Sequence, residues 1–169
     1  MNRNWNTNWR KSIIIMSGGF DPVHKGHLRM FREASWLGHQ VIVGLNSDDW
    51  LSRKKGKPFM KFEERKEIIE GFKYVNQVIP FDDSDDTASD LIRRVYNIYE
   101  GEEHEHEYED FDHMGMVGYY QLYFANGGDR TTDNVPEMKV CKELDVTMLW
   151  GVGGGKIQSS SWLINGGKE

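Results

Sequence analysis

Hydrophobic and polar residues alternate along this chain in two distinct ways. Short apolar runs flanked by polar or glycine residues predict buried strands, whereas apolar residues spaced three or four apart predict helices with one buried side. The expected strands are residues 13–16, 40–45, 75–80, 122–125 and 146–150, and the expected helices are residues 25–37, 49–51, 61–72, 88–99, 135–144 and 159–164. Because strands and helices alternate throughout, the pattern favours an α/β fold: a Rossmann-like parallel sheet with helices on both faces, in a single domain.

Four polar or glycine-rich loops directly follow expected strands. In an open parallel sheet, ligands bind beyond the carboxyl ends of the strands, where such loops meet. We therefore expect these loops to converge on one edge of the sheet and to form a single site. They are residues 17–27, 46–57, 126–130 and 151–161.

Residues 17–28 carry the most specific pattern, S-G-G-F-D-P-V-H-K-G-H-L. His24 and His27 are three residues apart, so they share one face of the first helical turn. That turn also presents unpaired backbone N–H groups and the positive end of the helix dipole, which bind anions. Imidazole donors at such a helix start predict a phosphate cradle, and the glycines before it allow backbone to approach a ligand closely.

The run G-G-F-D-P-V-H-K-G-H at residues 18–27 resembles the H-x-G-H signature, G-x-F-D-x-x-H-x-G-H, of the cytidylyltransferase-like nucleotidyltransferases. This superfamily transfers a nucleotidyl group from an NTP to a phosphate-bearing acceptor. The resemblance implies that His24 and His27 are catalytic residues that stabilise the transferred phosphate. It also implies that residues of the same loop bind the nucleotide: Gly18, Gly19, Phe20, Asp21 and Gly26. Asp21 is a candidate for orienting this loop or a metal-bound water.

Residues 53–58 read R-K-K-G-K-P and place four cations in five positions. Taken alone, this segment is either a solvated surface loop or a phosphate-binding loop, and its position at the expected ligand edge favours the second interpretation. The order of motifs over residues 46–65 resembles that of glycerol-3-phosphate cytidylyltransferases and heptose-phosphate adenylyltransferases. That resemblance implies the following roles: catalysis by Lys54, Lys55 and Lys57, and substrate binding by Asn46, Asp48 and Arg65.

A glycine-rich turn follows the expected strand at residues 122–125. Glycines and aspartate suit a tight turn, and taken alone a turn is the simpler interpretation. The sequence F-A-N-G-G-D at residues 124–129 resembles the element by which heptose-phosphate adenylyltransferases hold the nucleotide. The resemblance therefore implies nucleotide binding by Gly127, Gly128, Asp129 and Arg130.

Three serines stand at the start of the last expected helix. Helix capping accounts for one of them, but three in a row at the positive end of a helix also suit a phosphate. They resemble the closing I-S-S-S or I-S-T-T element of the family, which implies triphosphate binding by Ser159, Ser160 and Ser161. Many relatives carry Arg-Thr at the positions of Gly154 and Gly155, so Lys156 is the candidate replacement for the missing cation.

Charge is distributed unevenly over the 169 residues. Residues 100–112 contain eight acidic side chains and no Lys or Arg, and the rest of the chain carries a net charge of +2 against −6 overall. We expect an acidic insert at about residues 100–118. It is either a metal site through His104, His106 and His113 or, as the spacing favours, a solvated insertion. Residues 1–11 are expected to be disordered, and residues 12–169 to form the domain.

Neither a nucleic acid nor a membrane is an expected partner. The body of the chain is near neutral, and no apolar run approaches the roughly 20 residues that span a bilayer. A single cysteine, Cys141, excludes a disulfide framework within the chain and favours a reducing compartment. The expected location is therefore the cytoplasm.

These patterns and the resemblance together predict a nucleotidyltransferase. It moves CMP or AMP from CTP or ATP to a small phosphorylated sugar or polyol, with release of pyrophosphate, and the choice between ATP and CTP stays open. Mg²⁺ is the expected cofactor, held through the phosphates and not by direct side-chain ligation, and a homodimer is the expected assembly. Two alternatives stay open: a catalytically inactive nucleotide-binding or regulatory module, and an adenylyltransferase for another acceptor such as nicotinamide mononucleotide or phosphopantetheine.

Overall fold

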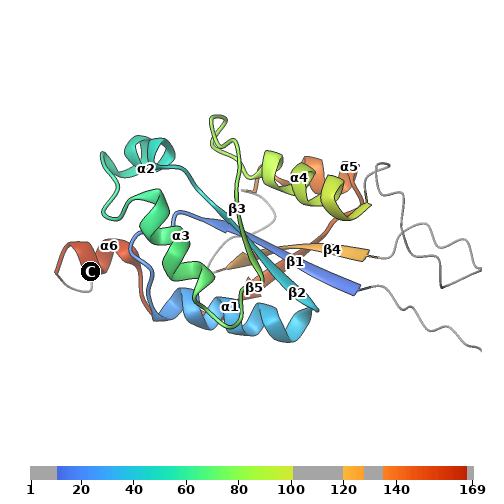
Figure 1. The fold of residues 1–169 in the computed structure, drawn as a ribbon, viewed down its shortest axis with the longest axis horizontal. Helices are drawn as coiled ribbons and strands as arrows, with labels where there is room; N and C mark the ends of the chain where they lie inside the picture. The colour runs from blue at the N-terminus through green and yellow to red at the C-terminus, as the bar shows by residue number, and fades with distance from the viewer. Residues whose placement is uncertain (1–10, 101–119, 128–134, 167–169) are drawn as a thin grey trace, which may run out of the picture.

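The computed structural model describes residues 11–100, 120–127 and 135–166. Within these residues, five strands form one parallel sheet in the order β3-β2-β1-β4-β5 (Figure 1). The strands are β1 (Lys11–Gly18), β2 (Gln40–Leu45), β3 (Gln77–Pro80), β4 (Tyr120–Gly127) and β5 (Thr147–Val152). The predicted α/β class with a Rossmann-like parallel sheet is confirmed.

Helices connect these strands and follow the last of them. Those in the described residues are α1 (Lys25–Leu37), α2 (Asp48–Lys55), α3 (Phe62–Glu70), α4 (Ser89–Glu100), α5 (Met138–Glu143) and α6 (Ser160–Ile164). α1 and α3 cover one face of the sheet, and α4 and α5 cover the other (Figure 1). In the described part of the chain, no helix is long and apolar enough to cross a membrane.

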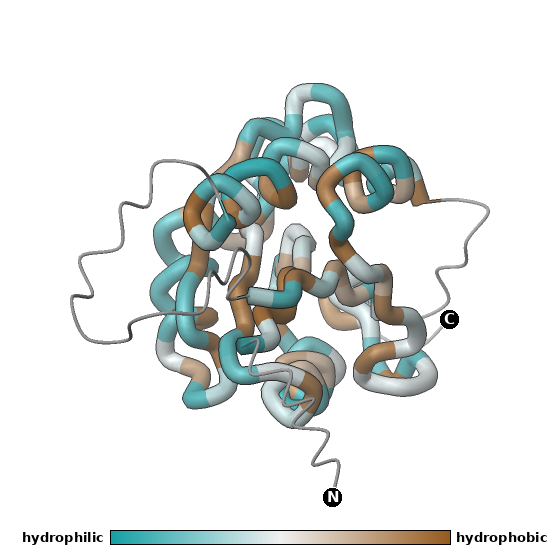
Figure 2. The backbone as a smooth tube through the Cα atoms, turned by 90° about the vertical axis from the view of Figure 1, so that its right-hand side faces the viewer, coloured by the Kyte–Doolittle hydropathy of each residue, from teal (hydrophilic) through white to brown (hydrophobic). Residues whose placement is uncertain are grey.

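The central strand β1 contributes to two separate cores. Ile13 and Ile15 pack toward α4 and α5, while Ile14 and Met16 pack toward α1 and α3, and all four side chains are fully buried. Successive residues of a strand point to opposite faces, so a strand buried on both sides has a continuous apolar sequence. The helices bury one side only, and Figure 2 shows hydrophobic and hydrophilic colours alternating along them.

The basic segment differs most from the sequence prediction. α2 covers Asp48–Lys55, whereas the pattern predicts a helix only at residues 49–51 and a loop from residue 53. Ser47 begins the helix by accepting a hydrogen bond from the Trp50 N–H at 3.0 Å, and Gly56 ends it with a φ of +87°. Three cations therefore lie in the last helical turn, where they complement the negative end of the helix dipole. The prediction of a loop at residues 53–55 is wrong for this reason.

The strand order places a change of direction at β1. The chain builds the sheet outward through β2 and β3, and then continues on the other side of β1 with β4 and β5. In open α/β sheets, ligands bind at such a point, between the loops that follow the two central strands. The insert predicted at residues 100–118 lies outside the described residues except at its first position, and the segment predicted at residues 1–11 lies outside them except at its last.

Candidate active site

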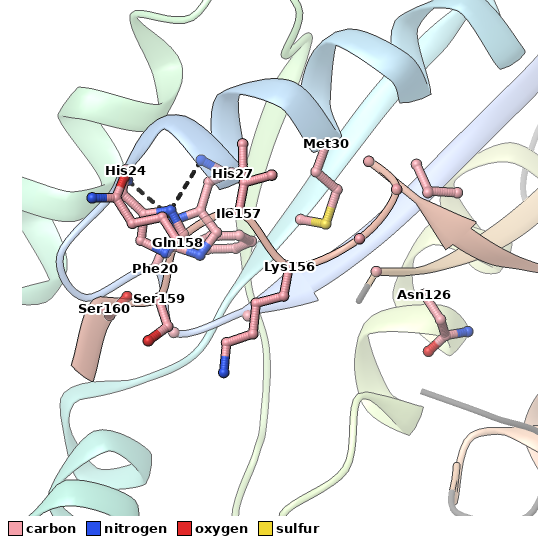
Figure 3. A pocket seen from close by; sticks show the side chains of 18 of the residues that line it. Phe20, His24, His27, Met30, Asn126, Lys156, Ile157, Gln158, Ser159 and Ser160 are labelled. Atoms are coloured by element: carbon pink, nitrogen blue, oxygen red, sulfur yellow. Dashed lines mark hydrogen bonds between the residues drawn. The ribbon is translucent and has the colours of Figure 1, made fainter. Parts of the chain in front are cut away.

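A cavity of about 420 Å³ lies at the carboxyl ends of β1 and β4 (Figure 3). Its walls come from residues 17–20, His24, Gly26, His27 and Met30, from Lys55, from residues 125–127 and from residues 152–161. Three of the four predicted loops therefore meet there, together with one residue of the fourth. The described residues that line the cavity include no carboxylate, whereas Lys55 and Lys156 bring two cations. The cavity is thus suited to an anionic ligand.

His24 and His27 stand at the start of α1 with their rings stacked, with 3.6 Å between centroids and 19° between planes. The Gly26 N–H donates to His24 Nδ1 at 3.1 Å, and the His24 N–H donates to His27 Nδ1 at 3.2 Å (Figure 3). These bonds satisfy N–H groups that the first helical turn leaves unpaired. Because each Nδ1 is an acceptor, the proton of each neutral ring lies on Nε2.

Both imidazoles are neutral near neutral pH. Burial, with smaller contributions from His24 and Lys55, lowers the pKa of His27 from 6.5 to about 3. Burial and the Lys55 ammonium also lower the pKa of His24. The pair therefore offers two neutral Nε2–H donors side by side in the cavity that it lines. Such donors can stabilise charge on phosphoryl oxygens without gaining or losing a proton.

Phe20 and Gly26 hold the histidine pair in this arrangement. The buried Phe20 ring meets His27 edge-on, with 4.9 Å between centroids, and also packs on Phe31 of α1. A Cβ at Gly26 would come within 2.9 Å of the His24 ring, so any larger residue there displaces the ring. Four of the predicted nucleotide-binding residues of this loop line the cavity: Gly18, Gly19, Phe20 and Gly26.

Asp21 has a different environment from its neighbours. Its side chain is buried, and its carboxylate accepts hydrogen bonds from the Phe59 and Met60 N–H groups at 2.8 and 2.7 Å. Each carboxylate oxygen is therefore used to fasten the segment before α3 to the loop after β1. Asp21 does not line the cavity, and its contacts fit a role in orienting the loop.

Arg65, predicted to bind substrate, is fully buried. Its guanidinium donates to three carbonyl oxygens and to one carboxylate: Gly19 at 2.7 Å, Asn46 at 2.9 Å, Met60 at 3.0 Å and Asp48 at 2.7 Å. The loops after β1 and β2 are thereby joined to α3. The structure brings the predicted Asn46, Asp48 and Arg65 together, but as a support for the loops and not in the cavity lining.

Of the three predicted catalytic lysines, only Lys55 lines the cavity. Its Nζ donates to the Asp21 carbonyl at 2.8 Å. Burial lowers the pKa of Lys55, although the Asp21 charge opposes the shift. Lys54 instead forms an ion pair with Asp86 at 3.3 Å, and Lys57 is exposed beyond the end of α2.

The loop after β5 and the start of α6 form the last wall of the cavity. Ser159 caps α6 by accepting from the Trp162 N–H at 3.3 Å, and Ser160 donates to the Pro22 carbonyl at 2.9 Å. The second bond ties this wall to the loop before α1. Lys156 Nζ lies 5.0 Å from the centre of the Trp162 ring. All four residues predicted here line the cavity: Lys156, Ser159, Ser160 and Ser161.

Asn126 lies across the cavity from the histidine pair (Figure 3). The neighbouring Gly127, predicted to bind nucleotide, also lines the cavity, whereas the predicted residues 128–130 lie outside the described residues. The predicted loop at residues 126–130 includes Asn126, but the sequence prediction assigns no role to this cavity residue. The available signal is its position, directly after the strand predicted at residues 122–125 and directly before a glycine pair.

A model of the cytidylyltransferase-like family matches residues 15–146. The chain belongs to this family. The matched range of this cytidylyltransferase-like chain includes the histidine pair, α2 and Arg65, and it ends before the last wall of the cavity.

Two curated relatives show how far the similarity extends. The chain is 30% identical over 86 residues to glycerol-3-phosphate cytidylyltransferase from Bacillus subtilis (strain 168), a match that covers 51% of this chain and 67% of the relative. It is 31% identical over 147 residues to bifunctional protein HldE from Haemophilus influenzae (strain PittGG). That match covers 79% of this chain but only 29% of the relative, so the chain spans less than a third of the length of this HldE protein.

Solved structures share the fold at low sequence identity. The lipopolysaccharide core biosynthesis protein from Thermoplasma volcanium GSS1 aligns with a TM-score of 0.56 and 19% identity, over 83% of this chain and 94% of that one. A bifunctional NMN adenylyltransferase/ADP ribose pyrophosphatase from Francisella tularensis aligns with a TM-score of 0.58 and 15% identity, over 92% of this chain and 42% of that one. These likenesses support the cytidylyltransferase-like fold.

Proposed function

We propose that this protein transfers a nucleotidyl group from an NTP to a small phosphorylated sugar or polyol, with release of pyrophosphate. The observation that carries the proposal is the pair of neutral imidazole donors in a cavity whose described lining holds two lysines and no carboxylate. Membership of the cytidylyltransferase-like family supports it, as does similarity to a glycerol-3-phosphate cytidylyltransferase. CTP and ATP are both candidate donors.

The reaction needs no nucleophile from the protein. A phosphate oxygen of the acceptor attacks the α-phosphorus of the NTP in line, the bond from that phosphorus to the bridging oxygen breaks, and pyrophosphate leaves with this oxygen. Catalysis then consists of positioning the reactants and stabilising the charge that builds on phosphoryl oxygens. Neutral donors suit this task because they keep their protons throughout.

Each wall of the cavity has its own role in this mechanism. His24 and His27 donate through Nε2 to oxygens of the transferred phosphate, and Lys55 and Lys156 offset the remaining negative charge. The serine hydroxyls at the start of α6 hold the outer phosphates. Arg65 acts as a positioning residue, because its donors are engaged by carbonyls and a carboxylate of the protein.

Mg²⁺ belongs to this proposal as a phosphate-bound ion. In the described residues, no three His, Cys, Asp or Glu side chains come together as metal ligands, and both histidine Nδ1 atoms accept from backbone N–H groups. The side chains of this part of the chain therefore do not fit a resident metal site. Mg²⁺ commonly retains waters and binds substrate phosphates, where it neutralises their charge.

A cytoplasmic location and a homodimeric assembly are further parts of the proposal. The lone cysteine, Cys141, is buried and free, which fits a reducing compartment. Size-exclusion chromatography with light scattering measures the assembly directly.

Pyrophosphate release tests the proposed function. The protein is incubated with Mg²⁺, one of ATP, CTP, GTP or UTP, and one acceptor. The acceptors are a panel of sugar and polyol phosphates that includes glycerol 3-phosphate, together with nicotinamide mononucleotide and phosphopantetheine, and nucleotide binding is measured in parallel by calorimetry. We expect release that requires both a nucleotide and an acceptor. Nucleotide binding without release from any pair would support the regulatory module instead, and release only with nicotinamide mononucleotide or phosphopantetheine would support the other class of acceptor.

A further inference from the structure

Asp83 is a buried carboxylate in the loop after β3, with an exposed fraction of 4%. Its Oδ2 accepts from Asn46 Nδ2 at 3.0 Å and from the Ser47 N–H at 2.7 Å, and its Oδ1 accepts from the Ser47 hydroxyl at 2.8 Å. Ser47 is also the residue that caps α2. One carboxylate therefore holds both residues that connect β2 to α2.

Asp83 also binds the last turn of α2. Arg53 Nη2 donates to the main-chain carbonyl of Asp83 at 2.6 Å and lies 3.8 Å from its Oδ1. The rise of the helix from Ser47 to Arg53 is about 9 Å, because each residue adds about 1.5 Å. Two contacts this far apart fix the direction of a helix, whereas a single contact leaves it free to pivot.

Apolar packing gives α2 little support of its own. The helix lies beyond the carboxyl end of β2 (Figure 1), and Leu51 is its only buried residue. Most of the stability of a helix in a protein comes from a buried apolar face. A helix with one buried side chain therefore depends more on polar contacts such as those of Asp83.

Lys55, the last residue of α2, depends on the direction of this helix. It lines the cavity, and its Nζ donates to the Asp21 carbonyl at 2.8 Å. Because α2 rises about 12 Å along its length, a tilt of about 10° at its start would move its end by roughly 2 Å. A displacement of about 1 Å at a reacting centre can cost up to 10²-fold in rate. The contacts at Ser47 thus determine where the Lys55 ammonium lies.

We propose that Asp83 is a positioning residue for nucleotidyl transfer, which fixes the direction of α2 and thereby keeps Lys55 in the cavity. Asp83 is not among the residues that line the cavity, so it acts through Lys55 and not on the substrates. This inference rests on the proposed function, because it takes the anion that Lys55 meets to be a phosphate of the NTP.

A double-mutant cycle with Lys55 tests this inference on the full chain. Asp83→Ala, Lys55→Met and the variant with both changes are compared with wild type in the pyrophosphate-release assay. We expect Asp83→Ala alone to lower kcat/KM by about five- to tenfold, close to the effect of Lys55→Met. Where residue 55 is already Met, Asp83→Ala should lower it by less than ~twofold. A change that only weakens the fold would have the same effect in both backgrounds.

Two further variants of the same loop are the controls. Asp83→Asn keeps an acceptor oxygen for Ser47 and should recover part of the activity lost in Asp83→Ala. Asp86→Asn is the matched control, because the Asp86 carboxylate pairs with Arg53 and Lys54 of the last turn at 3.2 and 3.3 Å but is exposed. It should change kcat/KM by less than ~twofold. Asparagine also tolerates the φ of +63° at this position.

Circular dichroism melting shows which variants fold. If Asp83→Ala does not fold, Asp83→Asn takes its place in the cycle with Lys55→Met. If neither folds, Asp83 supports the whole domain and not the direction of α2, and the inference is overturned.

Isothermal titration calorimetry with inorganic triphosphate repeats the cycle without turnover. We expect the same pattern: weaker binding in Asp83→Ala, and less than ~twofold further change once Lys55 is Met. An equal loss in both backgrounds, in either assay, overturns the inference and leaves nucleotidyl transfer standing, and so does activity of Asp83→Ala like that of wild type. If wild type binds triphosphate but releases no pyrophosphate, the proposed function fails and the titration decides the role of Asp83. If wild type binds no triphosphate, both fail.

Discussion

The start of α1 and the end of α2 both carry polar side chains at the same edge of the sheet. The two regions differ in how many of these side chains line the cavity. At α1, both histidines line the cavity, and backbone hydrogen bonds at 3.1 and 3.2 Å hold them there. At α2, Lys55 lines the cavity, while Lys54 reaches Asp86 outside it. The α2 segment has the higher density of cations, yet the α1 segment supplies more of the candidate site.

The difference lies in what determines the direction of each side chain. A histidine has two side-chain torsions, and here its own ring nitrogen is part of the helix cap, so backbone and ring form one unit. A lysine has a long flexible stem and a strongly hydrated charge that can pair with whichever acceptor is near. Rigid donors close to a helix start thus define a site better than a larger number of mobile charges.

Removing the Nε2 donors is expected to have the largest effect. The Asn side chain can accept the same backbone hydrogen bond as His Nδ1, but it has no group at the position of Nε2. His24→Asn and His27→Asn should therefore each lower kcat by about 10²–10³, or roughly 3–4 kcal/mol, in the pyrophosphate-release assay. His24→Gln and His27→Gln place an amide N–H near that position and should recover part of the loss.

Circular dichroism melting is the control for these variants, because the Asn changes are designed to keep the helix cap. Turnover like that of wild type in either Asn variant, with the fold intact, would remove the histidine pair from the reacting centre. Activity that persists in the Asn variants but is lost in the Gln variants would assign the histidines to the cap alone.

The next effect concerns the neutral state of the pair. The pKa of His27 is about 3 in the folded protein and near its ordinary 6.5 in the unfolded chain. Between these values the unfolded chain binds a proton that the folded protein does not. The free energy of unfolding should therefore fall as the pH drops below about 6.5, by up to ~1.4 kcal/mol per pH unit, and this contribution is absent at higher pH.

Urea unfolding at about pH 7, 6 and 5 measures this slope in wild type and in His27→Asn. The variant does not titrate at this position, so its free energy of unfolding should fall less steeply. Parallel curves for the two proteins would show that His27 takes up a proton as readily in the folded protein as in the unfolded chain.

The two adjacent lysines of α2 should show the smallest effect. Met removes the charge and keeps a long flexible side chain. Lys55→Met should lower kcat/KM by about tenfold, because a charged hydrogen-bond donor is lost from the cavity. Lys54→Met should change it by less than ~twofold, because an exposed ion pair contributes little. Steady-state kinetics of both variants tests the ranking, and the reverse order contradicts the placement of Lys55 in the site.

Much of the fold follows from the sequence because the period of apolar residues reports burial directly. The apolar run at residues 13–16 falls within β1, and the predicted helix at residues 25–37 agrees with α1. The prediction fails at the end of α2. It begins a helix at residue 49 but ends it at residue 51, because it gives more weight to the cluster of cations than to the stop at Gly56. That stop signal is present in the sequence.

The candidate site is harder to predict from the sequence than the fold, because the direction of a long side chain depends on partners that are distant in the sequence. Arg65 belongs to a motif whose resemblance implies substrate contact, yet the carbonyls that bind it come from three separate segments. Asn126 stands out only once its burial and its lack of a side-chain partner among the described residues are known. Sequence patterns therefore identify which loops meet, and the packing decides which side chains enter the cavity.

The buried Arg65 has a consequence for how this chain can vary. Three of its four acceptors are main-chain carbonyls, at Gly19, Asn46 and Met60. Every amino acid has such a carbonyl, so Arg65 places no requirement on the side chains at those three positions. The ion pair, in contrast, requires a carboxylate at Asp48 and the arginine itself. Substitutions can accumulate around the support while its geometry persists, provided that these two residues change together or not at all.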